Sequence, residues 1–254
     1  HKNTSVRAQV EESPLFGVVM ARVAICGVAR TPIGKFRGSL SNLSAVELGV
    51  RSVKELLKRC SIDASSGVID EVLFGQVLQA GAGQAPARQV ALGAGLPNTI
   101  AATTINKVCG SSLKAVMMAA NSIKAGEYKA IIAGGMESMT NAPKFEKRNG
   151  EEKEMLSTMV HDGLWDVYND VHMGNTGEIV ANECNISREK MDSFAARSQN
   201  RAAEAEANGW FDWERFDMSE LSTDEGVRAG TTAEKLAGLK PVFQEDGMVT
   251  AGNA

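Results

Sequence analysis

The chain has 254 residues, of which 43% are hydrophobic and 23% are charged, which is an ordinary composition for a globular protein. This length allows one large domain or two modest ones. A formal net charge of −4 and an aromatic content of 5% argue against nucleic acid or an acidic membrane surface as a partner. No apolar run approaches the roughly 20 residues that a membrane-spanning helix needs.

The four cysteines are Cys26, Cys60, Cys109 and Cys184, and they lie far apart in the sequence. No pair has the CxxC spacing of zinc ribbons or thioredoxin-like proteins, so we expect no metal site and no disulfide framework. Free thiols in a reducing compartment are the simpler interpretation. We expect Cys26, Cys60 and Cys184 to be small buried hydrophobic residues, as most lone cysteines are.

Residues 1–20 differ in character from the rest and are interpreted as a leader or as a remnant upstream of a native start at Met20. They lack the long apolar segment of a secretory signal, and they contain acidic residues that organellar leaders avoid. We therefore favour a cytoplasmic protein, while a mitochondrial one stays open.

Apolar runs alternate with helical patterns from residue 22 to residue 133. The expected strands are residues 22–28, 70–78, 102–108 and 129–133. The expected helices are one that follows the capping-box pattern Ser44 to Glu47, one that begins at Pro86 and runs to about residue 93, and one at residues 111–125. This alternation predicts an α/β fold of βαβ units, with helices on both faces of the sheet.

The character of the sequence changes at about Met139. Residues 144–154 are strongly charged without an apolar face, which predicts a solvated loop. Residues 187–208 have the pattern of a long Ala-rich helix that ends before Gly209. The sequence stops on Thr-Ala-Gly-Asn-Ala without a stop signal, which favours an incomplete sequence over a natural terminus, although continuation past Ala254 stays open.

Cys109 lies at a predicted strand-to-helix junction. The start of a helix directs free backbone N–H groups and a partial positive charge at the preceding residues, and this field favours the nucleophilic thiolate over the thiol. Gly110 leaves space for a substrate carbonyl, and Ser111 and Ser112 can cap the helix. The local residues alone leave two interpretations open, a reactive cysteine or a packed one.

The segment Asn106-Lys-Val-Cys109-Gly-Ser-Ser-Leu-Lys-Ala115 resembles the acyl-enzyme motif of the thiolase family, although many members have glycine at the position of Ser112. Further thiolase-like stretches follow in the family's order up to the last residue. They are Ala29-Arg-Thr-Pro-Ile-Gly34, Gly83-Gln-Ala-Pro-Ala-Arg-Gln89, Ala133-Gly-Gly-Met-Glu-Ser-Met139, Asp162-Gly-Leu-Trp-Asp-Val-Tyr-Asn169, His172-Met173-Gly174 and Val249-Thr-Ala-Gly-Asn-Ala254.

The resemblance implies a layered αβαβα fold of which this chain holds the first half. Residues 21–138 would form that half, and residues 139–254 would form an inserted α+β loop domain that binds coenzyme A. It also implies acyl transfer through an acetyl-cysteine at Cys109, forming acetoacetyl-CoA from two acetyl-CoA or running the reverse thiolysis. Coenzyme A is then a substrate, and no cofactor is implied.

The resemblance further suggests which residues contact coenzyme A. By matching motif positions they are Leu164, His172, Met173, Arg228, Phe243 and Ala251. A basic side chain suits the nucleotide phosphates, apolar ones suit the walls of the tunnel, and a bulky methionine near the acyl end should restrict the pocket to short chains. A potassium requirement is not expected, because Gln199 stands where potassium-dependent members have tyrosine.

A Claisen reaction also needs a base for the cysteine and donors for the enolate oxygen. In thiolases the activating histidine, a second reactive cysteine and an Asn-Glu oxyanion segment lie in the second half, and no segment here matches them. We therefore expect this fragment alone to be inactive. Alternatives are a broader-chain 3-ketoacyl-CoA thiolase, a related synthase, or a non-catalytic subunit that binds acyl-CoA or serves assembly. By analogy the protein would be a homodimer or homotetramer.

Overall fold

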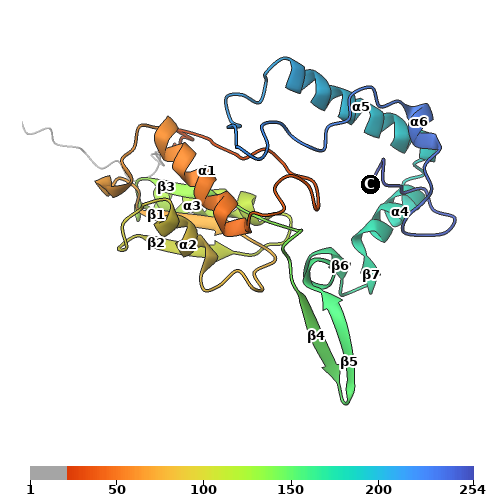
Figure 1. The fold of residues 1–254 in the computed structure, drawn as a ribbon, viewed down its shortest axis with the longest axis horizontal. Coiled ribbons are helices and arrows are strands. Elements are labelled where there is room, and N and C mark those ends of the chain that lie inside the picture. The colour runs from red at the N-terminus through yellow and green to blue at the C-terminus, as the bar shows by residue number, and fades with distance from the viewer. Residues whose placement is uncertain (1–21) are drawn as a thin grey trace, which may run out of the picture.

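The structure, a computed structural model, describes residues 22–254 (Figure 1). The interpretation of residues 1–20 as a leader therefore lies outside the described residues. The elements in chain order are α1 (Ala45–Arg59), the 3-10 helix η1 (Ala64–Ser66), β1 (Glu71–Gly75), α2 (Pro86–Gly93), β2 (Ala101–Ile105), α3 (Ser111–Ala125), β3 (Ile131–Gly135), β4 (Lys144–Asn149), β5 (Glu152–Ser157), the π-helix η2 (Met159–Leu164), β6 (Trp165–Asp166), β7 (Val171–His172), α4 (Met173–Glu183), α5 (Arg188–Ala207) and α6 (Ala233–Ala237).

A capping box begins α1, as the sequence predicted. The Glu47 amide donates to Ser44 Oγ at 3.2 Å, and the Ser44 amide donates to Glu47 Oε2 at 2.8 Å. Such a cap stabilises a helix by about 1 kcal/mol. Val53 and Leu57, one turn apart, are buried and direct one face of α1 into the core.

The three strands β2, β1 and β3 form a parallel sheet with β1 in the centre. Successive side chains of β1 point to opposite faces. Val72 and Phe74 pack in the cluster that includes α1 and α2, whereas Leu73 packs against Ala115 and Ala119 of α3. Helices therefore cover both faces of the sheet (Figure 1), which confirms the predicted βαβ arrangement.

The expected strand at residues 22–28 is wrong, because the segment joins no β-ladder in the described part of the chain. Ile25 is 78% exposed. Backbone pairing with another segment appears at Arg30, whose amide donates to the Glu214 carbonyl at 2.8 Å in an isolated bridge with Arg215. A β-branched sequence favours extended backbone, but a strand also needs a neighbour with free N–H and C=O groups.

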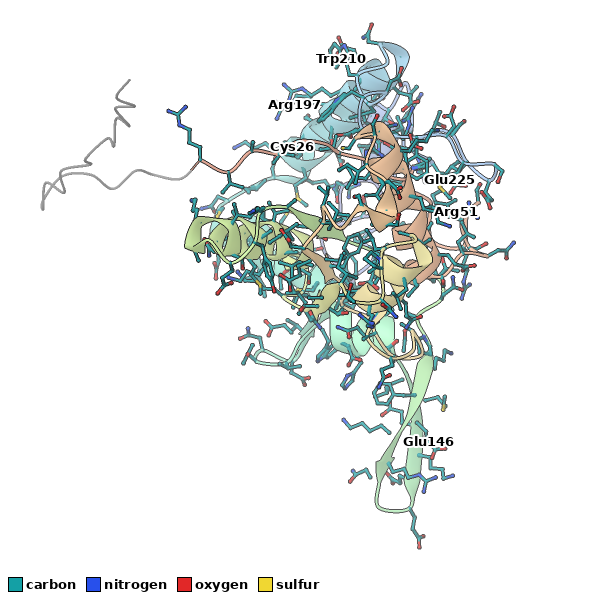
Figure 2. The ribbon with its side chains drawn as sticks, turned by 90° about the vertical axis from the view of Figure 1, so that its left-hand side faces the viewer. Cys26, Arg51, Glu146, Arg197, Trp210 and Glu225 are labelled. Atoms are coloured by element: carbon teal, nitrogen blue, oxygen red, sulfur yellow. The ribbon has the colours of Figure 1, made fainter. Side chains whose placement is uncertain are left out.

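The loop expected at residues 144–154 is instead part of the antiparallel hairpin of β4 and β5. Its register pairs Lys144 with Ser157 and Asn149 with Glu152 across a two-residue turn in which Gly150 has φ of +65°. Its charged side chains are solvent-exposed, as predicted, and Figure 2 shows them extending from a hairpin that projects away from the rest of the protein. The sequence did not predict these strands because the segment has no apolar face and therefore lacks the alternating pattern that identifies a strand.

Acidic side chains fasten the last residues of the chain to the long helices. Glu178 of α4 is 3% exposed and accepts the amides of Met248 and Val249 at 2.7 to 2.9 Å. Asp192 of α5 accepts from Asn253 Nδ2 at 2.8 Å and pairs with Arg188. The predicted helix at residues 187–208 is confirmed as α5, with Ser187 and Asn208 as its capping residues.

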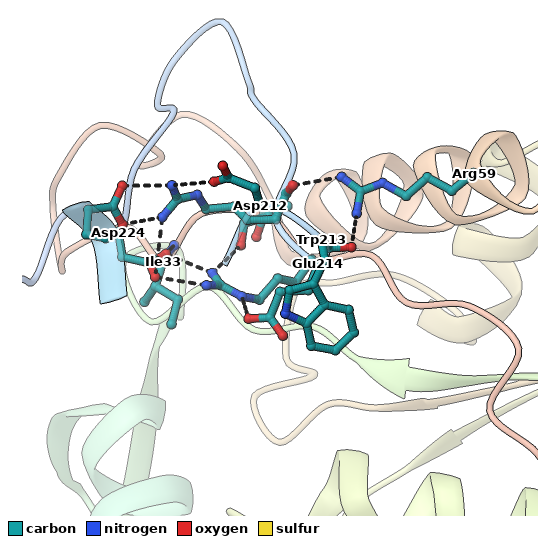
Figure 3. A network of polar contacts seen from close by, with 10 residues as sticks. Ile33, Arg59, Asp212, Trp213, Glu214 and Asp224 are labelled. Atoms are coloured by element: carbon teal, nitrogen blue, oxygen red, sulfur yellow. Dashed lines mark hydrogen bonds and ion pairs between the residues drawn. The ribbon is translucent and has the colours of Figure 1, made fainter. Parts of the chain in front are cut away.

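An ionic network joins the segment before α1 to the segment after α5 (Figure 3). Arg30 donates to Glu214 Oε1 at 2.6 Å and holds Asp224 with two guanidinium nitrogens at 2.8 and 3.0 Å. Arg59, near the end of α1, donates to the carbonyls of Trp213 and Arg215, each at 2.7 Å. Charged bidentate contacts of this kind fix the relative position of two segments far apart in the sequence.

The prediction of buried structural cysteines is wrong at two positions, because Cys26 and Cys184 are exposed and only Cys60 is partly buried. Cys26 lies in the segment that gains no strand neighbour, and Cys184 ends α4 as its C-cap. None of the helices in residues 22–254 combines the length and apolar character that crossing a bilayer requires.

One face of α3 is apolar and uncovered. Leu113 is 67% exposed, Met117 50% and Val116 36%. Exposed apolar side chains that gather on one helix face mark a surface that other protein segments cover.

Candidate active site

Cys109 lies in a tight turn between β2 and α3. Val108, just before it, has φ of +45°, and Gly110, just after it, is the N-cap of α3. A β-branched residue with positive φ is strained by about 1–3 kcal/mol, so the surroundings must impose this conformation. The Val108 amide donates to Asn106 Oδ1 at 2.9 Å, and the Gly110 amide donates to the Lys107 carbonyl at 3.1 Å. The turn presents Cys109 as an exposed side chain.

Ser111 stabilises the turn from inside. Its side chain accepts from the Lys107 amide at 2.8 Å and donates to the Val108 carbonyl at 2.6 Å. It is therefore not the cap of α3 that the sequence suggested, and the N-cap Gly110 offers no side-chain acceptor. The start of α3 keeps its partial positive charge beside Cys109, an arrangement that favours negative charge on a nearby group.

Two strand-final glycines let α3 begin close to the sheet. A Cβ atom on Gly75, at the end of β1, would lie 2.7 Å from Ser111 Cβ. A Cβ atom on Gly135, at the end of β3, would collide with Ser112 Oγ. The absence of these Cβ atoms brings Cys109 to the carboxyl edge of the sheet, where parallel α/β sheets place their sites. Ser112 stands where many thiolases have glycine, and its side chain fits here because Gly135, which lies against it, has no Cβ atom.

A cavity of about 380 Å³ opens beside Cys109. Its wall comes from the ends of β1 and β3, the turn before α3 and the π-helix η2. The lining residues other than Cys109 are Gly75, Gln76, Val77, Leu78, Val108, Ser111, Ser112, Gly135, Met136, Glu137, Met139, Gly163 and Leu164. Of the six residues predicted to contact coenzyme A, Leu164 alone shares this cavity with Cys109.

Three others of the six gather at the start of α4. The rings of His172 and Phe243 stack with centroids 5.1 Å apart and an interplanar angle of 21°. His172 Nδ1 accepts from the Gly174 amide at 3.0 Å and so caps α4, and the phenyl ring lies directly against Gly174. Met173 is the first residue of α4 and is 38% exposed. His172 thus has a structural role in capping the helix, whatever it binds.

Arg228 lies in an exposed loop and Ala251 on an exposed turn. The Arg228 amide donates to Gln199 Oε1 at 2.8 Å, so Gln199 of α5 holds the loop that carries the arginine. Neither residue lines the Cys109 cavity. Their contact with coenzyme A stays a prediction that rests on motif position.

Two residues with no role predicted from the sequence, Gln76 and Glu137, line the Cys109 cavity. Glu137 Oε2 accepts from the amides of Val77 at 2.8 Å and Leu78 at 3.3 Å. Burial raises the pKa of this carboxyl, although these backbone donors oppose the rise. The available signal was an acidic residue two positions after the apolar strand that ends in Gly134 and Gly135.

Within residues 22–254, no group of three or more His, Cys, Asp and Glu side chains could hold a metal ion. His161 contacts Asp162 at 2.8 Å and His172 stacks on Phe243, and neither histidine lines the Cys109 cavity. The cavity therefore contains a candidate nucleophile without a histidine base among the described residues.

The fold and the site together define an α/β protein that presents a cysteine at the start of a helix, above a cavity at the carboxyl edge of a parallel sheet. The chain belongs to the thiolase family: residues 23–254 match the family model for the N-terminal domain of thiolase. The family match and the parallel sheet support the expected thiolase-like fold, of which this chain holds the first half.

Curated relatives agree with this assignment. The chain is 48% identical over 249 residues to acetyl-CoA acetyltransferase of Cupriavidus necator, which covers 92% of this chain and 63% of the relative. It is 48% identical over 241 residues to acetyl-CoA acetyltransferase of Yarrowia lipolytica, covering 91% and 60%. It is 46% identical over 248 residues to acetyl-CoA acetyltransferase 2 of Arabidopsis thaliana, covering 91% and 61%. The chain therefore spans less than two thirds of the length of these relatives.

Proposed function

We propose that the full-length protein is an acetyl-CoA C-acetyltransferase, a thiolase that forms acetoacetyl-CoA from two acetyl-CoA or catalyses the reverse thiolysis. Membership of the thiolase family and relatives with that printed name support the reaction class. The single structural observation that carries the proposal is the strained turn at Val108, which presents Cys109 beside the start of α3.

In this mechanism Cys109 attacks the thioester or ketone carbonyl as a thiolate. In the synthetic direction, the Cys109 sulfur bonds to the acetyl carbon and the C–S bond to coenzyme A breaks, so coenzyme A leaves as the thiol after taking a proton. The α-carbon of a second acetyl-CoA then loses a proton and attacks the acetyl-cysteine, which releases Cys109 and forms acetoacetyl-CoA. A thiolate suits both steps because it is a good nucleophile and a good leaving group.

The protein outside this chain has to supply the missing parts of the site. No histidine lines the cavity of Cys109 in the described part of the chain, so we assign the base that takes the thiol proton and the donors that bind the enolate oxygen to protein outside it. The uncovered apolar face of α3 is consistent with further protein packed beside this cysteine. On this proposal the fragment alone turns over no substrate, and the assembled protein is a homodimer or homotetramer.

For coenzyme A we propose contacts from Leu164 at the cavity of Cys109, from the cluster of His172, Met173 and Phe243, and from the exposed Arg228 and Ala251. Leu164 is supported by its position in the cavity wall. The stacked rings of the cluster are supported by their partial exposure, which leaves an apolar surface for the pantetheine arm. Arg228 is supported by its exposed position, which leaves its charge accessible to phosphate.

The test is thiolysis of acetoacetyl-CoA by the full-length protein and its Cys109→Ala variant. The proposal predicts loss of at least about 1,000-fold in turnover, as removal of a covalent nucleophile causes. Cys184→Ala is the matched control, because Cys184 is also exposed but ends α4 away from the cavity. If Cys109→Ala retains full turnover, the protein is not a thiolase of this mechanism.

A second set of substrates separates the alternatives. A short-chain enzyme should cleave acetoacetyl-CoA much faster than longer 3-ketoacyl-CoA, whereas comparable rates would favour the broader-chain thiolase. Binding of acyl-CoA without turnover, in wild type as in Cys109→Ala, would favour the non-catalytic subunit.

A further inference from the structure

Gln76 and Glu137 both border the Cys109 cavity, and each has one side-chain oxygen that is buried without a hydrogen-bond partner in the described part of the chain. Gln76 is only 2% exposed. A buried polar atom left without a partner costs about 1–3 kcal/mol. Two such oxygens in one cavity wall therefore need a physical explanation.

The other atoms of the two side chains fix which oxygens are free. Gln76 Nε2 donates to the Leu78 carbonyl at 3.1 Å, so turning the amide over would place its oxygen against another oxygen. Glu137 Oε2 accepts the amides of Val77 and Leu78. This leaves Gln76 Oε1 and Glu137 Oε1 without partners among the described residues, on two side chains that both line the Cys109 cavity and both bind the backbone of Leu78.

Two acceptors become a hydrogen bond only when a proton lies between them, and only the carboxyl of this pair can carry one. A proton on Glu137 Oε1 leaves both bonds accepted by Oε2 in place. Burial also raises the pKa of Glu137, which favours the protonated form.

Burial outweighs the hydrogen bonds that oppose the protonated form, which come from the backbone amides of Val77, Leu78 and Ser138. The other titratable residues that line the two cavities bordered by Glu137 are Cys109 and Lys35. The pKa of Glu225 is lowered first by the hydrogen bond from the Lys35 backbone amide and also by the Lys35 charge, so that ammonium group acts on a different carboxylate.

We infer that Glu137 is held as a neutral carboxylic acid that donates from Oε1 to Gln76 Oε1, directly or through one water molecule, and so gives the cavity of Cys109 an uncharged wall. An ionised carboxylate here would oppose the thiolate of Cys109 by like-charge repulsion. The neutral acid removes that opposition and still holds the Val77 and Leu78 amides in place. The inference concerns this chain alone and does not require that the full-length protein has the proposed activity.

Infrared spectroscopy of the full chain labelled with ¹³C-glutamate tests the inference near neutral pH. The wild type should show the carbonyl band of a protonated carboxyl, which is lost in Glu137→Gln and kept in Glu151→Gln, an exposed control at the tip of the hairpin. Raising the pH should abolish the same band in the wild type without any substitution. Absence of such a band in the wild type, or its persistence in Glu137→Gln, would overturn the inference.

Glu137→Gln also mimics the neutral acid, because its amide oxygen can accept from Val77 and Leu78 while its NH₂ group donates toward Gln76. At neutral pH we expect the melting temperature of this variant and its rate of Cys109 alkylation by iodoacetamide to equal those of the wild type. Faster alkylation in the variant would indicate that Glu137 is ionised in the wild type. A melting temperature below the wild type at every pH, while Glu151→Gln is unaffected, would also contradict the neutral acid.

Discussion

Asp224→Asn tests the ionic network that joins the segment before α1 to the segment after α5 (Figure 3). Asp224 binds both terminal nitrogens of Arg30 at 2.8 and 3.0 Å and accepts the Ile33 amide at 2.9 Å. The asparagine oxygen can keep the bond to Ile33. Its NH₂ group, however, faces a guanidinium nitrogen, so one acceptor becomes a donor and the negative charge is lost.

The size of the effect follows from burial. The side chain of Asp224 is 12% exposed and that of Arg30 is 27% exposed, so the pair is screened less than a surface ion pair but is not fully desolvated. A hydrogen bond to a charged group contributes about 1.5–3 kcal/mol, and breaking a fully buried pair costs about 3–5 kcal/mol. Since Arg30 keeps its contact with Glu214 at 2.6 Å, we expect Asp224→Asn to lower the free energy of unfolding by about 2 kcal/mol.

The assay is urea denaturation of the wild type, Asp224→Asn and the control Asp217→Asn, whose carboxylate is exposed on the same segment. The control should shift the free energy of unfolding by less than about 0.5 kcal/mol. Burial alone would raise the pKa of Asp224, but hydrogen bonds from Arg30 and Ile33 outweigh it, so the pKa is lowered.

A lowered pKa means that the stabilisation by Asp224 is present above the unfolded value of about 3.9 and is lost as the pH falls through the folded value. The difference between wild type and Asp224→Asn should therefore narrow below about pH 3.9. Equal stability of the two proteins at neutral pH would refute the account of the network.

Three further predictions concern other parts of the chain. Gly135→Ala should displace the start of α3 and destabilise the chain by about 1–3 kcal/mol, with slower alkylation of Cys109; unchanged reactivity would contradict the close approach. Glu178→Ala removes the acceptor of the Val249 amide, so hydrogen exchange at that amide should become at least about 10-fold faster. An unchanged exchange rate would show that Glu178 does not hold this segment. Glu220, which is hydrogen-bonded by Arg51, should titrate with a pKa of about 2 by NMR, and this pKa should rise in Arg51→Ala, where the Ser219 hydroxyl still donates; a wild-type pKa near 4.5 would contradict this ion pair.

Local sequence signals predicted the central βαβ part of the fold well. The capping box at Ser44, the proline that begins α2 and the pattern of α3 each depend on residues within one or two turns, and the structure has these helices at the expected positions. The three strands of the sheet were also expected, with ends one to three residues away from those observed.

The errors share a physical cause, which is dependence on distant partners. Residues 22–28 have the residue types of a strand but find no neighbouring strand in residues 22–254. The hairpin of β4 and β5 forms through backbone pairing between two charged segments, so neither has the alternating apolar pattern. Exposure of Cys26 and Cys184 likewise depends on what packs beside them and not on residue type.

In the candidate site, too, features set by local sequence were predictable and features set by contacts in the folded chain were not. The position of Cys109 at a strand-to-helix turn was predictable, because it follows from the strand, the glycine and the helix pattern around it. The positive φ at Val108 and the role of Ser111 inside the turn were not, since both follow from contacts within the folded turn. Glu137 reaches the cavity only because β3 lies beside β1 in the sheet.

The central claim is that Cys109 is the residue that accepts an acyl group. Its most direct test is incubation of the full-length protein with ¹⁴C-acetyl-CoA, followed by quenching in acid and peptide mapping by mass spectrometry. We predict an acetyl group on the peptide that contains Cys109 and none on the peptides of Cys26, Cys60 or Cys184. Acetylation at another residue, with Cys109 left as the free thiol, would contradict the account.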